Sequence, residues 1–168
     1  HKTMKYMFAS DVHGSAYYCR KMLDVYKEEK AERLVLLGDL LYHGPRNDLP
    51  REYAPKQVIS MLNDMKKEIY AVRGNCEAEV DQMVLQFPVM ADYCILNLDG
   101  RTFYATHGHI YNENNLPPIQ EGDILIHGHT HVLKAEQKEG YVLLNPGSVS
   151  IPKEGNPPTY AIVKSIEL

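Results

Sequence analysis

Seven residues of the chain, each at the end of a short apolar run, are candidate ligands for divalent metal ions through oxygen or imidazole nitrogen. They are Asp11, His13, Asp39, Asn75, His107, His129 and His131. A single tetrahedral zinc site would need only three or four protein ligands, so seven indicate two ions that share one carboxylate. The mixture of oxygen and imidazole ligands, without cysteine, suits Mn²⁺, Zn²⁺, Fe²⁺ or Ni²⁺ better than Ca²⁺.

The spacing of these residues supports a common site. Asp11 and His13 are two positions apart, and so are His129 and His131. On extended backbone, residues with this spacing point to the same side, so each pair can reach one ion. Each motif alone has a high false-positive rate, because a lone Asp-x-His or Gly-Asp is usually ordinary surface or turn chemistry. Their joint occurrence in this order predicts a dinuclear centre.

The charge of such a centre indicates its chemistry. Two divalent ions bring four positive charges, and two aspartates remove two of them. The surplus can hold a hydroxide that bridges the metals together with a phosphate oxyanion. Metals so placed lower the pKa of bound water and stabilise the attacking and the leaving oxygen, which is what hydrolysis of a phosphate ester requires.

Five short apolar runs position the ligands, because each run ends on one or two of them. With their ligands, the runs are 7–14, 34–39, 69–75, 103–109 and 124–131. Such runs predict buried strands, and a glycine beside the ligand allows a tight turn. Strands that present ligands at their carboxyl ends gather them along one sheet edge, where open α/β sheets bind ligands.

The rest of the pattern predicts an α/β fold with two mixed sheets packed face to face and helices outside. Ser15 can cap a first helix, Pro55 opens a second, and a third runs over 77–85 with Val80, Met83 and Val84 directed inward. Strand–helix alternation implies parallel strands. Asp99-Gly100 then predicts a hairpin between 93–98 and 102–106, and further strands follow at 123–126, 134–137, 141–144 and 160–166.

Composition narrows the class of protein. The 168 residues favour one domain, expected over 4–168, with residues 1–3 interpreted as an extension before a natural start at Met4. A net charge of -4 provides no strong nucleic-acid signal, and no apolar stretch approaches a membrane span. Three widely spaced cysteines favour a reducing, cytoplasmic compartment. The oligomeric state is open, with a symmetric homo-oligomer as one expectation.

The ordered motifs resemble those of a known family. They are Asp11-Val12-His13, Gly38-Asp39, Gly74-Asn75, His107-Gly108 and Gly128-His129-Thr130-His131. In this order they resemble the signature of the calcineurin-like metallophosphoesterases. The neighbouring stretches 8–11, 43–47, 71–76 and 145–153 are similar to the small bacterial YfcE-type phosphodiesterases. The resemblance covers essentially the whole chain.

The resemblance implies a four-layer α/β-β/α sandwich and a division of the ligands between two metals, with Mn²⁺ as the suggested ion. One metal would be held by Asp11, His13, Asp39 and His131, and the other by Asp39, Asn75, His107 and His129. Asp39 would then bridge the two ions. It also implies hydrolysis of a small phosphodiester by the bridging hydroxide, with Asp39 and Asn75 at the reacting centre.

One position departs from many members of the resembled family. Where they carry a histidine that can protonate a leaving alkoxide, this chain has Cys76, followed by Glu77. A thiol is a poorer proton donor than imidazole at neutral pH. We therefore expect diesters with acidic leaving groups to be preferred, with Cys76 in the catalytic site. The alternative is that Cys76 is a small buried filler.

Substrate contacts are predicted less directly. Arg46 and Arg73 carry guanidinium groups that suit phosphate oxygens, and His43 lies in a Gly-Pro loop after Asp39. Arg73 has an alternative interpretation, in which it braces the neighbouring Gly-Asn turn. Two other activities stay open for the same site, phosphomonoesterase and nucleotide pyrophosphohydrolase. A third hypothesis is a non-enzymatic scaffold, as in the retromer subunit of similar fold, but the intact ligand set argues against it.

Overall fold

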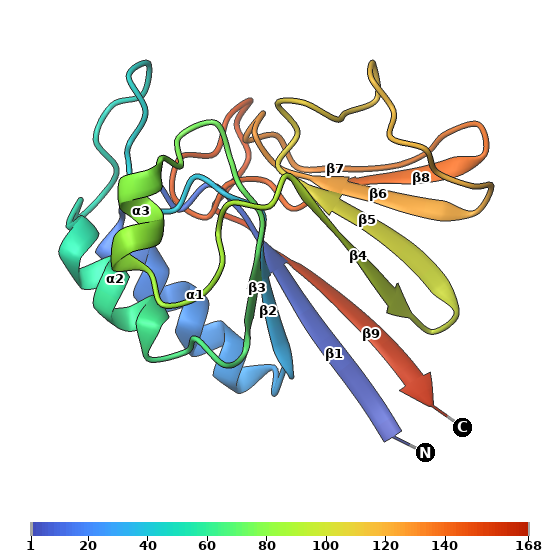
Figure 1. Ribbon diagram of the computed structural model, residues 1–168, viewed down its shortest axis with the longest axis horizontal. Coiled ribbons are helices and arrows are strands. Elements are labelled where there is room, and N and C mark those ends of the chain that lie inside the picture. Colours follow the sequence, from blue (N-terminus) through green and yellow to red (C-terminus); the bar gives the residue numbers. More distant parts are fainter. Residues whose placement is uncertain (1, 168) are drawn as a thin grey trace.

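The computed structural model describes residues 2–167 and contains two mixed β-sheets, one of four strands and one of five (Figure 1). The first sheet has the order β3 (Ile69–Ala71), β2 (Arg33–Leu36), β1 (Lys2–Ala9) and β9 (Ala161–Glu167). The second has the order β4 (Tyr93–Leu98), β5 (Arg101–Thr106), β6 (Asp123–His127), β8 (Tyr141–Asn145) and β7 (Lys134–Gln137). Parallel strands form the centre of each sheet, and β9, β4 and β7 are antiparallel at the edges.

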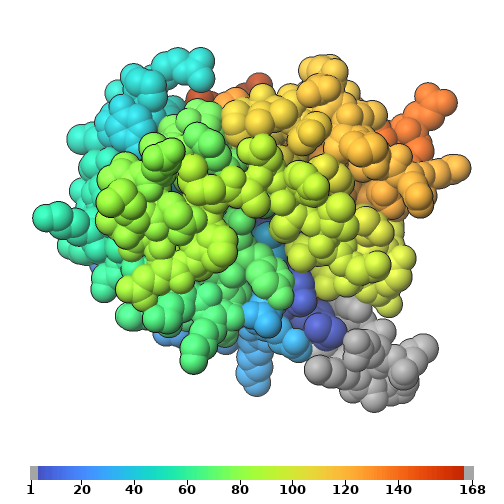
Figure 2. All heavy atoms as spheres, viewed as in Figure 1, coloured from blue at the N-terminus to red at the C-terminus, as the bar shows by residue number. Residues whose placement is uncertain are grey.

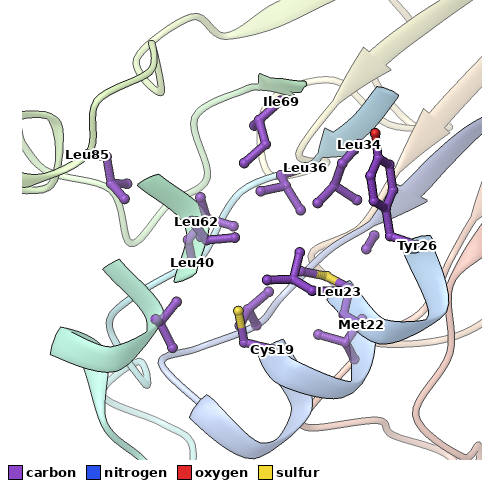
Figure 3. Close-up of a cluster of buried hydrophobic side chains, with 14 of the residues drawn as sticks. Cys19, Met22, Leu23, Tyr26, Leu34, Leu36, Leu40, Leu62, Ile69 and Leu85 are labelled. Atoms are coloured by element: carbon purple, nitrogen blue, oxygen red, sulfur yellow. The ribbon is translucent and has the colours of Figure 1, made fainter. Parts of the chain in front are cut away.

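Three helices cover the outer face of the first sheet: α1 (Ala16–Glu28), α2 (Pro55–Asn63) and α3 (Glu79–Val84). Ser15 caps α1 by accepting the Tyr18 N–H, and Pro55 stands at the start of α2, as expected. Figure 3 shows Leu23 of α1 and Leu62 of α2 directed at the strand residues that form this core. Packing of these helices buries one face of β1 and β2.

A second core lies between the two sheets. Side chains alternate along a strand, so Met7 of β1 faces the helices while Phe8 faces the second sheet. Phe8 stacks on Phe103 of β5, with ring centroids 5.9 Å apart. Burial on both faces explains why β1, β2 and β6 read as continuous apolar runs rather than alternating ones. The expected architecture of two mixed sheets flanked by helices is confirmed.

The outer face of the second sheet has a different cover. Tyr104, Leu125 and Leu143 are buried there against Tyr111 and Ile119. Both covering residues belong to the irregular segment 108–122, and no helix follows α3 within the described residues up to 167. Within the described residues the helices therefore lie on the first sheet, and the outermost layer on this side is a loop in place of the second helical layer of the implied four-layer sandwich. None of the helices in the described chain is both long enough and apolar enough to span a bilayer.

The prediction for the third helix was wrong in its orientation. Its three apolar residues face outward, with exposed fractions of 61% for Val80, 82% for Met83 and 39% for Val84, and Figure 2 shows this light-green segment at the surface. The helix begins at Glu79 rather than Glu77. The Gln82 side chain bonds the backbone of Leu85, Phe87 and Val89. These bonds, together with the burial of Leu85 and Phe87 in the core, rotate α3 so that its apolar residues face solvent.

Candidate metal centre

The turns that follow β1, β2, β3, β5 and β6 meet at one end of the molecule, among the loops at the top of Figure 1. All seven predicted ligands lie on these turns. Among the histidine, cysteine and acidic residues, ligand atoms within 4.8 Å of one another form three groups: Asp11, His13 and His131; Asp39, His107 and His129; and His13, Asp39 and Cys76. Ligand atoms that bind one ion at about 2.1 Å lie roughly 3–3.4 Å apart. Donor atoms separated by such distances can therefore bind one ion together.

The first group is formed by Asp11, His13 and His131. The Asp11 Oδ1 atom lies 3.4 Å from His13 Nε2 and 3.3 Å from His131 Nε2, and the two imidazole nitrogens are 3.2 Å apart. Asp11 Oδ1 is buried and has no hydrogen-bond partner in the described chain. A buried carboxylate oxygen normally requires a partner, and three donor atoms that converge at these distances fit a cation.

The second group is formed by Asp39, Asn75, His107 and His129. His107 Nε2 lies 3.2 Å from Asp39 Oδ2 and 3.0 Å from Asn75 Oδ1, and His129 Nδ1 lies 3.0 Å from Asn75 Oδ1. Asp39 Oδ2 is also 3.7 Å from His13 Nε2 of the first group. The same carboxylate oxygen therefore faces both groups, which is the geometry expected of a bridging ligand.

Backbone carbonyls orient three of the histidines. Each Nδ1–H donates to a carbonyl oxygen: His13 to Tyr42 at 2.8 Å, His107 to Leu37 at 2.6 Å and His131 to Ile151 at 2.6 Å. This bond fixes a proton on Nδ1 and directs Nε2 at the cluster, as in metal-binding histidines generally. The partners are backbone atoms, so no sequence motif could have identified them.

Five of the ligands adopt a strained backbone conformation. Positive φ angles occur at Asp11 (58°), His13 (50°), Asp39 (57°), His129 (70°) and His131 (62°). Residues other than glycine are uncommon in this region, although Asp and His are enriched there. Such strain concentrates at functional sites, where the surrounding structure enforces it. Here it directs successive side chains into the cluster immediately after each strand.

Two glycines allow the turns to approach the ligands closely. A Cβ atom on Gly74 would lie 2.2 Å from Asp39 Oδ1, and one on Gly128 would lie 2.1 Å from Ser10 Oγ. Ser10 Oγ in turn donates to Asp11 Oδ2 at 2.7 Å. Any larger residue at these positions would displace a carboxylate ligand.

Glu77 holds two of the ligand turns together, a role that the sequence analysis did not predict. Its buried carboxyl accepts the Asp39 N–H, at 2.7 Å to Oε1 and 3.0 Å to Oε2, and the Gly74 N–H at 3.2 Å. Burial, followed by the charge of Asp39, raises the pKa of Glu77 to about 7. The sequence shows only a carboxylate two positions after Asn75, and the contact with the Asp39 turn becomes visible in the structure alone.

Electrostatic coupling within the cluster separates the pKa values of its histidines. Burial alone would lower the pKa of His107, but the Asp11 and Asp39 carboxylates raise it to about 9. Burial, and then the charge of His107, lowers the pKa of His129 to about 4. Burial opposes ionisation of Asp11, yet the surrounding histidines hold its pKa well below the usual value. In the metal-free protein, a proton on His107 therefore supplies part of the positive charge that a bound metal would supply.

Cys76 lies at the edge of the second group. Its N–H donates to Asp39 Oδ1 at 2.9 Å, and its Sγ lies 3.6 Å from Asn75 Nδ2. Burial, and then the Asp39 and Glu77 carboxylates, raise the pKa of the thiol to about 12. It lines a cavity of about 300 Å³ that also contains ligands from both groups. The thiol is placed beside the centre, and in the metal-free protein it is protonated at neutral pH.

The three predicted substrate contacts occupy different positions. Arg46 lines the same cavity as Cys76. Arg73 is not among its lining residues, and its Nε donates to the Glu77 carbonyl at 3.2 Å, which is the bracing contact left open by the sequence. His43 lies between the rings of Tyr42 and Tyr53, with centroids 4.7 and 5.4 Å away. Of the three, Arg46 has the position that a substrate contact requires.

Comparison with known proteins gives a consistent result. Residues 4–167 match the family model described as the calcineurin-like phosphoesterase superfamily domain. The chain is 48% identical over 160 residues to phosphodiesterase YfcE of Escherichia coli strain K12, covering 95% of this chain and 87% of that protein. It is 24% identical to phosphodiesterase MJ0936 of Methanocaldococcus jannaschii, covering 86% and 83% of the two chains.

Solved structures show the same fold. The E. coli phosphoesterase YfcE superposes with a TM-score of 0.93 over 95% of this chain and 87% of its own, at 48% identity. Vacuolar protein sorting 29 from Cryptosporidium parvum superposes with a TM-score of 0.61 at 18% identity, over 96% and 85% of the two chains. The second likeness concerns the fold alone.

Proposed function

The chain belongs to the calcineurin-like phosphoesterase superfamily, and on this premise we propose that it is a metal-dependent phosphodiesterase that hydrolyses a small diester at a dinuclear centre. The observation that carries the proposal is the Asp39 carboxylate, whose Oδ2 faces histidines of both ligand groups. E. coli YfcE, at 48% identity, is named a phosphodiesterase.

The residues fit two divalent ions. Asp11, His13 and His131 would hold one ion, Asn75, His107 and His129 the other, and Asp39 would contact both. When bound, such ions lower the pKa of water and stabilise charge on the attacking and leaving oxygens of an in-line displacement. The oxygen and imidazole donors suit Mn²⁺, our first choice, and also Zn²⁺, Fe²⁺ or Ni²⁺.

The chain's own groups prepare this site. The carbonyls of Tyr42, Leu37 and Ile151 keep three imidazoles in the tautomer that can bind a metal. Glu77 holds Asp39 and the turn before Asn75 in register. These contacts fix the donor atoms before substrate arrives, so little reorganisation is needed during the reaction.

Cys76 favours diesters with acidic leaving groups over monoesters. In the metal-free protein the pKa of its thiol is about 12, and a thiol is a weaker proton donor than imidazole for a departing alkoxide. A leaving group that departs as a stable anion does not need that proton. The phosphomonoesterase and nucleotide pyrophosphohydrolase alternatives use the same centre. They require that phosphate monoesters or nucleotide pyrophosphates be hydrolysed faster than diesters. A scaffold function does not require seven convergent donors.

The experiment is hydrolysis of bis-p-nitrophenyl phosphate and p-nitrophenyl phosphate by protein loaded with each divalent metal in turn. We expect the diester to be preferred, with Mn²⁺ the most effective ion. Asp39→Ala and His129→Ala should abolish hydrolysis, whereas Lys27→Ala, on an exposed position of α1, should not. Wild-type rates in either ligand variant would disprove the proposal, and faster monoester turnover would support the monoesterase alternative.

The remaining expectations are part of the same proposal. Cys19, Cys76 and Cys94 are free thiols, which is compatible with the reducing cytoplasm in which we place the enzyme. A symmetric homo-oligomer is retained as an expectation, to be measured by light scattering. The substrate is proposed to be a small molecule rather than a nucleic acid, because the net charge of -4 provides no general attraction to a polyanion.

A further inference from the structure

Two basic side chains that the metal centre does not use line the same cavity as the ligands. They are Arg46, on the loop after β2, and Lys153, on the loop after β8. We propose that Arg46 and Lys153 form a subsite for a second phosphate, carried on one arm of the diester substrate. This inference rests on the proposed phosphodiesterase function and specifies its substrate class.

Backbone contacts to the metal-binding histidines position both loops. The Tyr42 carbonyl, four residues before Arg46, accepts from His13 Nδ1. The Ile151 carbonyl accepts from His131 Nδ1, and the Lys153 N–H donates to the His131 carbonyl at 3.0 Å. Both loops are therefore anchored to histidines of the first ligand group.

The charges of the two side chains are not neutralised by the protein. Among residues 2–167, neither Arg46 nor Lys153 takes part in an ion pair, whereas Lys5, Arg20, Lys134 and Lys138 do. Both are exposed at the mouth of the cavity. A guanidinium and an ammonium together match the charge and the acceptors of a phosphate dianion.

The scissile phosphate does not need this charge. Two divalent ions less the carboxylates of Asp11 and Asp39 would leave two positive charges, which a hydroxide and a monoanionic diester would neutralise. Arg46 and Lys153 add two more. A substrate with one further dianionic phosphate would balance them, whereas a simple diester would leave both uncompensated.

A neighbouring cavity differs in its charge. A second cavity of about 230 Å³ shares His129 and Thr130 with the first. Its basic residue, Lys134, is already paired with Glu113 at 3.5 Å. The two cavities can accept the two arms of a diester, and only the first offers unpaired positive charge, so the additional phosphate is assigned to it.

The test compares two substrates that differ by one phosphate: thymidine 5′-(p-nitrophenyl phosphate) with and without a 3′-phosphate. The manganese-loaded wild-type enzyme should have a kcat/KM about tenfold higher for the phosphorylated substrate, mainly through KM, because a hydrogen bond to a charged group contributes about that factor. Arg46→Ala and Lys153→Ala should each remove most of this preference. Lys27→Ala, which removes one positive charge at the far end of α1, should retain it.

Calorimetric binding of thymidine 3′,5′-bisphosphate and thymidine 5′-monophosphate provides a readout that does not depend on turnover. Tighter binding of the bisphosphate by wild type, lost in Arg46→Ala and Lys153→Ala, supports the subsite. If neither ester is hydrolysed, the proposed function is rejected, but this binding result still supports the subsite. The inference is overturned if wild type shows no preference for the additional phosphate. It is also overturned if both variants weaken the two ligands equally.

Discussion

Removal of the Glu77 carboxyl tests whether the ligand turns are held in register by a residue that binds no metal itself. Glu77 Oε1 accepts the N–H groups of both Asp39 and Gly74, and both turns are buried at this point. In Glu77→Ala these N–H groups lose their acceptor. The carboxylate of Asp39 should then lose its fixed position between the two ligand groups.

The expected magnitude follows from the number of unsatisfied donors. A buried N–H left without a partner costs roughly 1–3 kcal/mol, so two such groups should lower the free energy of unfolding by about 3 kcal/mol if water partly replaces the carboxyl. With an m-value of about 2 kcal/mol/M, the urea midpoint should fall by about 1.5 M. Misplaced ligands should also weaken manganese binding by about 10–100-fold.

Urea unfolding of metal-free protein and calorimetric titration with manganese measure the two effects separately. Glu77→Gln keeps an acceptor oxygen and should recover most of the stability. The folded pKa of Glu77, about 7, is raised above its ordinary 4.5, so the stability that the carboxyl contributes is complete below pH 4.5 and declines as pH rises through 7. The advantage of wild type over Glu77→Gln should therefore shrink between pH 5 and pH 8.

The control is Glu28→Ala, an exposed carboxylate in the last turn of α1. It should change the urea midpoint little and leave manganese affinity intact. If Glu77→Ala unfolded at the wild-type urea concentration and bound manganese equally well, the positioning role of Glu77 would be refuted.

Three other predictions concern the same centre. Cys76→His should raise the hydrolysis of esters with alkoxide leaving groups by about 100-fold, because imidazole is an effective proton donor; p-nitrophenyl diesters should change little, and an equal gain for both substrates would contradict this role. The manganese affinity of metal-free protein should rise about tenfold per pH unit between pH 7 and pH 9 and then level off, because the metal must displace a proton from His107. Burial opposes that proton, but the Asp11 and Asp39 carboxylates raise the pKa of His107 to about 9. Calorimetry that found no pH dependence would exclude this competition. Gly128→Ala should lose metal at the first ligand group, because its Cβ would lie 2.1 Å from Ser10 Oγ and 2.7 Å from Asp11 Oδ2; metal analysis showing full occupancy in the folded variant would contradict the model of close approach.

The ligands could be predicted from the sequence because their signal is local. Each follows an apolar run, and parallel strands bring their carboxyl ends together whatever the details of packing. The hairpin at Asp99-Gly100 was equally local, and Leu98 pairs with Arg101 as a two-residue turn requires. The structure confirms the sheets and brings all seven donor residues into one cluster.

Other features depend on tertiary contacts and could not be predicted. The rotation of α3 is set by the bonds of Gln82 and the burial of Leu85, which lie outside the pattern of its apolar residues. The role of Glu77 requires knowing that the turns of Asp39 and Gly74 adjoin. The carbonyls that orient the histidines belong to loops whose sequence carries no trace of that contact.

The most direct test of the account is the number of manganese ions bound per chain, measured by elemental analysis alongside diester hydrolysis as metal-free protein is titrated. We predict two ions per chain in wild type, with hydrolysis appearing as the second ion binds, and loss of hydrolysis in Asp39→Ala. A fully active protein with a single ion, or an Asp39→Ala variant that retains two ions and full activity, would contradict the shared-carboxylate centre.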